Sequence, residues 1–163
     1  MSGIALNPRG LFDRSTVGKK TQPVVFEVEA GRISFFAEVL GETGAIHHDR
    51  AAARAAGHPD VVAPPTFAMV VDLEVGRTLD RQGHKSLLTP IGCDLTRLLH
   101  GEERYDYSGL IYAGDRLSIE TELAGFEDKK GSALELAHLH AGISHLERGV
   151  LVTITRSVVH RLD

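Results

Sequence analysis

The chain has 163 residues, of which 42% are hydrophobic and 25% charged, a size and composition that fit one globular domain with a buried core. Its 18 basic and 22 acidic residues give a net charge of -4 and lie scattered along the chain, so binding to nucleic acid is not expected. The single Cys93 excludes an internal disulfide, and neither a signal peptide nor a run of ~20 apolar residues is present, which favours a cytoplasmic protein without a membrane span.

The N-terminal part of the chain predicts an arm, a strand and a helix. The first 21 residues are polar and irregular, and we expect them to form an arm ahead of a single domain over residues 22–163. The segment VVFEVE at 24–29 has the period-two alternation of a strand. Apolar residues then recur at the spacing of one helical stripe: Ile33, Phe36, Ala37 and Leu40. Gly41 is expected to end this helix.

Two further helices are expected before the pattern changes to strands. A short Ala-rich helix, DRAAARAAG, begins at Asp49 as its N-cap and closes at Gly57. The segment VVAPPTFAMVVDLEV from residue 61 contains two prolines, which fit the first turn of a helix but not its interior. From Thr66 to Leu73 nearly every side chain is apolar, which is typical of a buried helix.

The second half of the chain is strand-like. Runs with alternating or β-branched residues predict strands at LSIETEL (117–123), LELAHL (134–139) and VLVTITRSVVHRL (150–162). The sequences DKKG and ERG lie between these runs as turns, which indicates an antiparallel meander. A buried helix and an antiparallel sheet must bury each other, so we predict an α+β fold in which a curled sheet wraps around one central helix.

The loop GETGAIHHD at 41–49 carries the residues best suited to chemistry. Glu42 and His47 are five residues apart, and a loop that folds back brings a carboxylate and an imidazole to one water molecule. Addition of water to a double bond conjugated to a thioester needs acidic and basic groups of this kind. One group takes a proton from water, another delivers a proton to C2, and a hydrogen-bond donor stabilises the enolate oxygen.

This loop resembles the motif G-D-x-N-P-[LIV]-H-x-[DE] of the MaoC-like hydratases and dehydratases. Glu42 takes the aspartate position, and four residues match the motif directly: Gly41, Ile46, His47 and Asp49. The segments VVAPPTF at 61–67 and LLHGEERYDYSGLIYAGD at 98–115 also resemble the subgroup described as the MaoC N-terminal dehydratase domain. The resemblance extends from about Val24 to Arg161. It implies the hotdog fold, which is the architecture that the residue pattern predicts.

The same resemblance implies a lyase of fatty acid metabolism acting on enoyl or 3-hydroxyacyl thioesters of coenzyme A or a carrier protein. The thioester is part of the substrate, and no separate cofactor is expected. Glu42 and His47 would form the catalytic pair, with substrate contacts from Gly41, Pro65, Thr66 and Phe67. Hotdog pockets usually lie between subunits, so the resemblance also implies a homodimer or higher homo-oligomer, with a heterodimer as the other form.

Two departures from the family motif bear on activity. Gly44 and Ala45 replace the asparagine and the proline of the motif. Pro64 and Pro65 stand where the hydratases have a histidine and the glycine whose backbone N–H stabilises the oxyanion, and proline has no N–H. The donor must then come from the first turn of the buried helix, through the N–H of Thr66 or Phe67 or through the Thr66 hydroxyl.

Other functions remain open from the sequence. The departures favour, as one alternative, a non-catalytic acyl-binding subunit of a heteromeric MaoC-type dehydratase. A second alternative is a hotdog acyl-CoA thioesterase that uses Glu74, although the helix is expected to reach the surface at that point. His48 and Cys93 are not expected to take part in catalysis. The His48 side chain is expected to point away from the catalytic pair, and Cys93 is expected to be a small buried side chain. Neither His138 and His140 nor any other group has convincing metal-ligand spacing, so no metal is expected.

Overall fold

The computed structural model describes residues 9–85 and 87–162. A 3-10 turn at Arg14–Thr16 precedes the first strand, and a second one lies at Ala45–His47. The remaining elements, in chain order, are β1 (Val24–Glu27), α1 (Ala30–Leu40), α2 (Arg50–Ala55), α3 (Phe67–Arg81), β2 (Leu98–Tyr107), β3 (Arg116–Lys129), β4 (Leu134–His145) and β5 (Gly149–Arg161).

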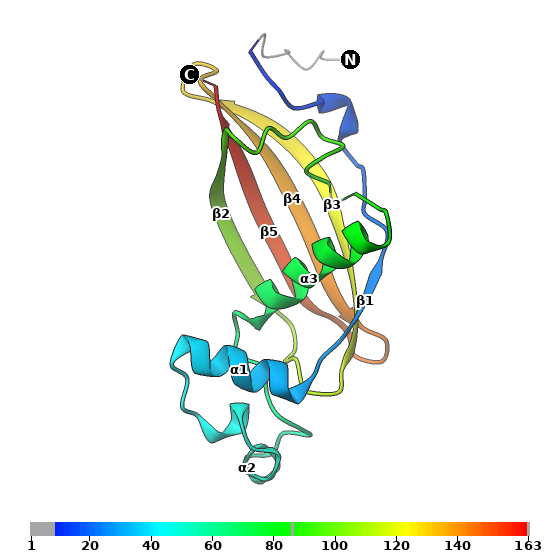
Figure 1. The fold of residues 1–163 in the computed structure, drawn as a ribbon, viewed down its shortest axis with the longest axis vertical. Helices are drawn as coiled ribbons and strands as arrows, with labels where there is room; N and C mark the ends of the chain where they lie inside the picture. Colours follow the sequence, from blue (N-terminus) through cyan, green and yellow to red (C-terminus); the bar gives the residue numbers. More distant parts are fainter. Residues whose placement is uncertain (1–8, 86, 163) are drawn as a thin grey trace.

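The five strands form one antiparallel sheet in the order β1-β3-β4-β5-β2. The meander β3–β4–β5 is joined by short turns, as the sequence predicts. The turn after β3 places Lys130, Gly131 and Ser132 at positive φ, which reverses the chain within a few residues. Figure 1 shows α3 lying across one face of the curved sheet. The predicted α+β hotdog architecture, a curled sheet around one helix, is confirmed.

One face of α3 forms the centre of the core. Its buried residues recur at helical spacing and are Phe67, Ala68, Val71, Val75 and Leu79. They pack against inward residues of the three central strands, including Ile119, Ile143 and Ile154. The prediction of a helix buried all round is wrong for the opposite face, because Met69 is 40% and Leu73 is 55% exposed. A single sheet covers only one side of the helix.

The helices α1 and α2 lie beyond the end of the sheet (Figure 1). α1 ends where the sequence predicts, at Gly41, which adopts the left-handed conformation with φ 76°. Ile33 and Ala37 of its predicted stripe are fully buried, whereas Leu40 is 48% exposed at the last turn. The Asp49 side chain caps α2 by accepting a hydrogen bond of 2.6 Å from the backbone N–H of Ala52, which confirms its predicted role.

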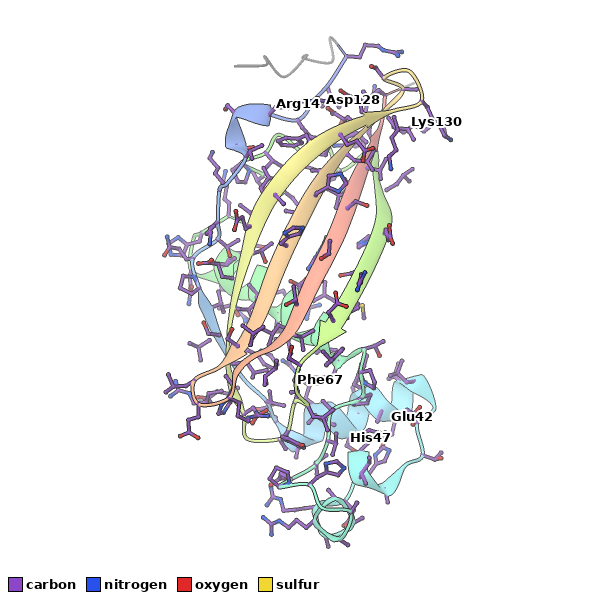
Figure 2. The ribbon with its side chains drawn as sticks, turned by 180° about the vertical axis from the view of Figure 1, so that it is seen from behind. Arg14, Glu42, His47, Phe67, Asp128 and Lys130 are labelled. Atoms are coloured by element: carbon purple, nitrogen blue, oxygen red, sulfur yellow. The ribbon has the colours of Figure 1, made fainter. Side chains whose placement is uncertain are left out.

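The N-terminal segment packs against the opposite end of the sheet. Phe12 belongs to a second apolar cluster with residues of β3, β4 and β5. Arg14 forms hydrogen bonds of 2.9 and 2.5 Å to the two carboxylate oxygens of Asp128. Figure 2 shows Arg14 and Asp128 at this end of the molecule and His47 at the other. No helix in residues 9–85 and 87–162 is long and apolar enough to cross a membrane.

Replacing Gly101 by alanine is expected to destabilise the edge strand β2. A Cβ at this position would lie 2.3 Å from the Ser157 Oγ and 2.9 Å from the Ser157 carbonyl oxygen, so β2 must shift away from β5. The register between the two strands already shifts between His100 and Glu103. We expect a loss of about 1–3 kcal/mol in the free energy of unfolding, measured by urea denaturation. Gly142→Ala on β4 is the matched control, because nothing lies within 4 Å of its added Cβ. Equal effects of the two substitutions would contradict this packing.

Candidate functional site

His47 is held by a backbone carbonyl at the end of the 3-10 turn Ala45–His47. Its Nδ1 lies 2.6 Å from the carbonyl oxygen of Val62. The Val62 N–H in turn donates to the Ile46 carbonyl at 3.0 Å, which fixes the two segments to each other. A carbonyl can only accept, so the Nδ1 atom carries the proton. The Nε2 atom of the neutral ring therefore has the free lone pair, and it is the atom that can act as a base.

The His47 ring lines a mostly apolar cavity of about 220 Å³. The wall residues are Ile46, His47, His58, Val62, Ala63, Pro64, Pro65, Tyr107, Leu110 and Ile111. No carboxylate is among them. Of the six site residues inferred from the family resemblance, His47 and Pro65 lie in this wall. The cavity therefore joins the 3-10 turn to the segment that leads into α3.

Glu42 is exposed, and its carboxylate does not line this cavity. Within the described part of the chain, no hydrogen bond or ion pair joins its carboxylate to the His47 ring. The backbone of Glu42 is fixed at the end of α1 by a bond from its N–H to the Ala37 carbonyl at 2.9 Å. Figure 2 shows Glu42 and His47 on the segment around the end of α1. The structure thus brings the histidine of the motif to the cavity without the acid.

His48 has a structural role. Its Nε2 lies 2.8 Å from the carbonyl oxygen of Glu42, and its Nδ1 lies 2.8 Å from the Oγ of Ser34. The carbonyl accepts, so Nε2 donates and Nδ1 accepts from the serine hydroxyl. Both ring nitrogens are therefore occupied in tying the loop to α1. This arrangement agrees with the expectation that His48 points away from the chemistry.

The first turn of α3 offers a smaller set of donors than the sequence suggests. The Phe67 N–H donates to the Pro64 carbonyl at 2.9 Å, and the Phe67 side chain is fully buried in the core. Thr66 occupies the N-cap position without a side-chain capping bond. Its backbone N–H has no partner among the described residues. Thr66 therefore has the free N–H at the start of α3, but neither Thr66 nor Phe67 is among the wall residues of the cavity. Gly41 lies in the exposed left-handed turn after α1, also outside the cavity wall.

Tyr107 is a wall residue whose contacts at α3 the sequence does not reveal. Its hydroxyl donates to the carbonyl of Pro65, and the Ala68 N–H hydrogen-bonds to its oxygen. The phenol therefore lies over the start of α3. Its alternation with Tyr105 on β2 is the sequence signal that could have placed it, and that signal is equally compatible with a packed sheet face. Burial raises the pKa of Tyr107 to about 12.

This raised pKa predicts a loss of stability at alkaline pH. Between pH 10 and about 12 the unfolded chain ionises Tyr107 and the folded chain does not, so the unfolded state binds fewer protons. The free energy of unfolding therefore falls as the pH rises through this window. We expect the fall to be smaller in Tyr107→Phe, measured by urea denaturation at steps of pH. Identical pH profiles for the two proteins would show that the surroundings of Tyr107 do not raise its pKa.

Two other candidate residues lie outside the cavity that holds His47. The Glu74 carboxylate is 2.7 Å from Arg77 Nη1, 3.7 Å from Arg32 Nη2 and 3.9 Å from Arg81 Nη2, so it is ion-paired to three arginines. Its side chain is only 12% exposed, which is less than the surface position expected from the sequence. Burial raises the pKa of the Cys93 thiol, which is the opposite of what a nucleophilic cysteine needs.

The described residues contain no group of three or more His, Cys, Asp or Glu that could hold a metal ion.

Comparisons with known proteins identify the family of the chain and its fold. A family model described as the FAS1-like dehydratase domain region matches residues 15–153. UPF0336 protein SCO4636 of Streptomyces coelicolor is 33% identical over 122 residues, which are 74% of this chain and 77% of that protein.

Two solved structures are similar in fold. The C-terminally truncated HadBC (3R-hydroxyacyl-ACP dehydratase) complex of Mycobacterium tuberculosis has a TM-score of 0.72 at 16% identity, covering 88% of this chain and 96% of that one. A MaoC-like dehydratase from Rhodospirillum rubrum has a TM-score of 0.66 at 21% identity, covering 93% and 97%. These TM-scores show a shared fold.

Proposed function

The chain belongs to the FAS1-like dehydratase-region family, and from this premise we propose that it adds water to, or removes it from, the C2–C3 bond of an acyl thioester. The substrates are enoyl or 3-hydroxyacyl thioesters of coenzyme A or a carrier protein. The thioester carbonyl polarises the double bond, so the protein needs to position a water, move a proton and stabilise the enolate oxygen.

One observation carries the proposal: His47, whose Nε2 has no hydrogen-bond partner among the described residues, lines an apolar cavity next to the start of a buried helix. In the hydration direction, His47 Nε2 takes a proton from water while the oxygen bonds to C3. The electron pair of the double bond moves to C2 and the thioester oxygen. The Thr66 N–H and the positive end of α3 are the groups suited to that oxygen. A solvent proton then adds to C2, and the protonated His47 releases its proton to solvent, which restores the starting state. Dehydration is the reverse of these steps.

A second candidate function is supported by the absence of a carboxylate from the cavity wall. The exposed Glu42 does not contact His47, and Pro64 and Pro65 supply no N–H. A chain of this kind suits an acyl-binding subunit that works with a second hotdog subunit, which brings the missing acid. The fold neighbour HadBC is a complex. In both functions the working form is an assembly of hotdog subunits, because the outer face of α3 and the edge strand β2 remain open in one chain.

The two candidates are separated by an enoyl-thioester assay. The purified chain is mixed with crotonyl-CoA, and loss of the enoyl-thioester absorbance is followed with and without a co-purified second hotdog subunit. Turnover by the chain alone supports a self-sufficient hydratase. Turnover only in the mixture supports the subunit role. Absence of turnover in both, with release of free thiol from acyl-CoA, would instead support the thioesterase alternative.

A further inference from the structure

A second cavity, of about 270 Å³, lies between the C-terminal half of α3 and the sheet. Its wall is largely aliphatic and includes Leu73, Val75, Leu79, Leu88, Leu139 and Val158. It shares no wall residue with the cavity that holds His47. Its volume corresponds to about nine water molecules at roughly 30 Å³ each, which suits a medium-length aliphatic chain.

Arg156 is one of six polar residues in this wall, with Thr21, Asp72, Asp80, His100 and Thr121. It lies on β5 between Ile154 and Val158, whose alternate positions point to the same face of the sheet and are 0% and 4% exposed. The Arg156 side chain is 16% exposed. Burying a guanidinium carries a desolvation cost that an aliphatic residue would avoid. A charge in this row therefore calls for a function beyond packing.

Two carboxylates surround the Arg156 guanidinium. Asp72 of α3 places an oxygen 2.7 Å from Nη2, and Glu103 of β2 places one 3.7 Å from Nε. Both carboxylates are mostly buried, with side-chain exposures of 12% and 22%. The Nε and Nη2 atoms are buried, and neither makes a hydrogen bond of good geometry. The cluster therefore holds a net negative charge, and its two enclosed donors reach a ligand only when a neighbouring side chain moves.

These properties distinguish between ligands. A methylene group at the cluster leaves the charges against hydrocarbon. A carboxylate meets two like charges for one opposite charge. A hydroxyl accepts from the guanidinium and donates to Asp72, so it satisfies both signs at once. We propose that this cavity binds an aliphatic chain that carries a neutral hydroxyl group, with Arg156 and Asp72 as the residues that recognise the hydroxyl. The proposal goes beyond the water-transfer reaction, because it concerns ligand binding in a cavity separate from the one that His47 lines.

The test is a titration of the isotope-labelled full chain, followed by NMR, with three probes of similar size. 1-Octanol donates and accepts, heptyl methyl ether only accepts, and octanoate is an anion. We expect 1-octanol to shift the Leu73, Leu79 and Val158 methyl signals and the Arg156 Nε–H signal. Its Kd should be roughly ten- to a hundredfold lower than that of the ether or octanoate, as expected for a hydrogen bond to a charged group. Equal or tighter binding of either competitor overturns the proposal, as does absence of 1-octanol binding.

A double variant, Asp72→Leu with Arg156→Met, replaces the ion pair by apolar side chains. It is expected to bring the Kd values of 1-octanol and heptyl methyl ether within about threefold of each other. The control is Arg104→Leu on β2, whose side chain is 70% exposed and which should leave the wild-type ratio unchanged. An unchanged ratio in the double variant contradicts the assignment of the hydroxyl to this pair. If the double variant does not fold, the comparison of the three probes on the natural chain still tests whether the cavity prefers a hydroxyl group.

Discussion

The variant His47→Ala is expected to lower the kcat for hydration of crotonyl-CoA by about 10²–10⁴-fold, the usual contribution of a positioned general base. The Nδ1 proton is held by the Val62 carbonyl, so the effect on catalysis is assigned to Nε2 of this cavity-lining residue. The loss of that hydrogen bond costs only about 1 kcal/mol of stability. The assay is run on the form that shows activity, whether the chain alone or its complex with a second subunit, and folding is checked by circular dichroism.

Two further variants make the His47 result specific. His58→Ala removes another imidazole from the same cavity wall and is expected to change kcat by less than about threefold. Glu42→Gln removes the exposed carboxylate without changing its size. A small effect of Glu42→Gln places the acid elsewhere, in a partner subunit or in the solvent. A loss as large as that of His47→Ala would mean that the loop closes over the substrate and that the pair implied by the family motif acts together.

The variant Glu135→Ala is expected to cause the largest loss of stability. Glu135 is fully buried on β4, and its Oε1 accepts hydrogen bonds from the backbone N–H groups of Leu11 and Phe12 at 2.6 and 3.1 Å. The same oxygen accepts from His160 Nδ1 at 2.9 Å. His160 Nε2 accepts from the Asp94 N–H at 3.0 Å, which fixes the neutral form of the ring. One carboxylate thus ties the N-terminal segment and the segment before β2 to the sheet.

Removing this carboxylate leaves the buried donors of Phe12 and His160 and the partly buried N–H of Leu11 without their acceptor. It also breaks the buried ion pair between Glu135 Oε2 and Arg14 Nη2 at 3.6 Å. We expect a loss of about 3–5 kcal/mol in the free energy of unfolding, as for a broken buried ion pair. For a chain of this size that corresponds to a Tm roughly 6–20 °C lower, measured by calorimetry. The matched control is Glu120→Ala on β3, whose carboxylate is 43% exposed in an ion pair with Lys20. A similar change in Tm for the two variants would falsify the role given to Glu135.

Much of the fold follows from the period of the apolar residues. The strands β1, β3, β4 and β5 and the helices α1, α2 and α3 lie where alternation, helical spacing and the caps at Gly41 and Asp49 predict them. The exposure of single side chains is predicted less well from this period, because it depends on which other segments of the chain pack over them. Glu135 has the alternation of a solvent-facing strand residue, yet the N-terminal segment buries it completely. Arg156 likewise lies in an inward row that periodicity alone would fill with aliphatic residues.

The site is predictable to the level of the motif and no further. The histidine of the motif, His47, lies at a cavity, and the two prolines do precede the buried helix. The direction of the Glu42 side chain depends on loop dihedral angles that a spacing of five residues does not determine. The position of Tyr107 over α3 joins residues 42 apart in sequence. Such contacts follow from tertiary packing, so residue patterns along the chain cannot reveal them.

The most direct test of the proposed reaction locates the atoms of water in the product. Crotonyl-CoA is incubated with the active form of the protein in water enriched in oxygen-18 and deuterium, and the products are analysed by mass spectrometry. The account predicts 3-hydroxybutyryl-CoA that carries the oxygen label at C3 and deuterium at C2, with incorporation lost in His47→Ala. Oxygen label in a free carboxylate, with the C2–C3 bond unchanged, would instead show hydrolysis of the thioester and contradict the account.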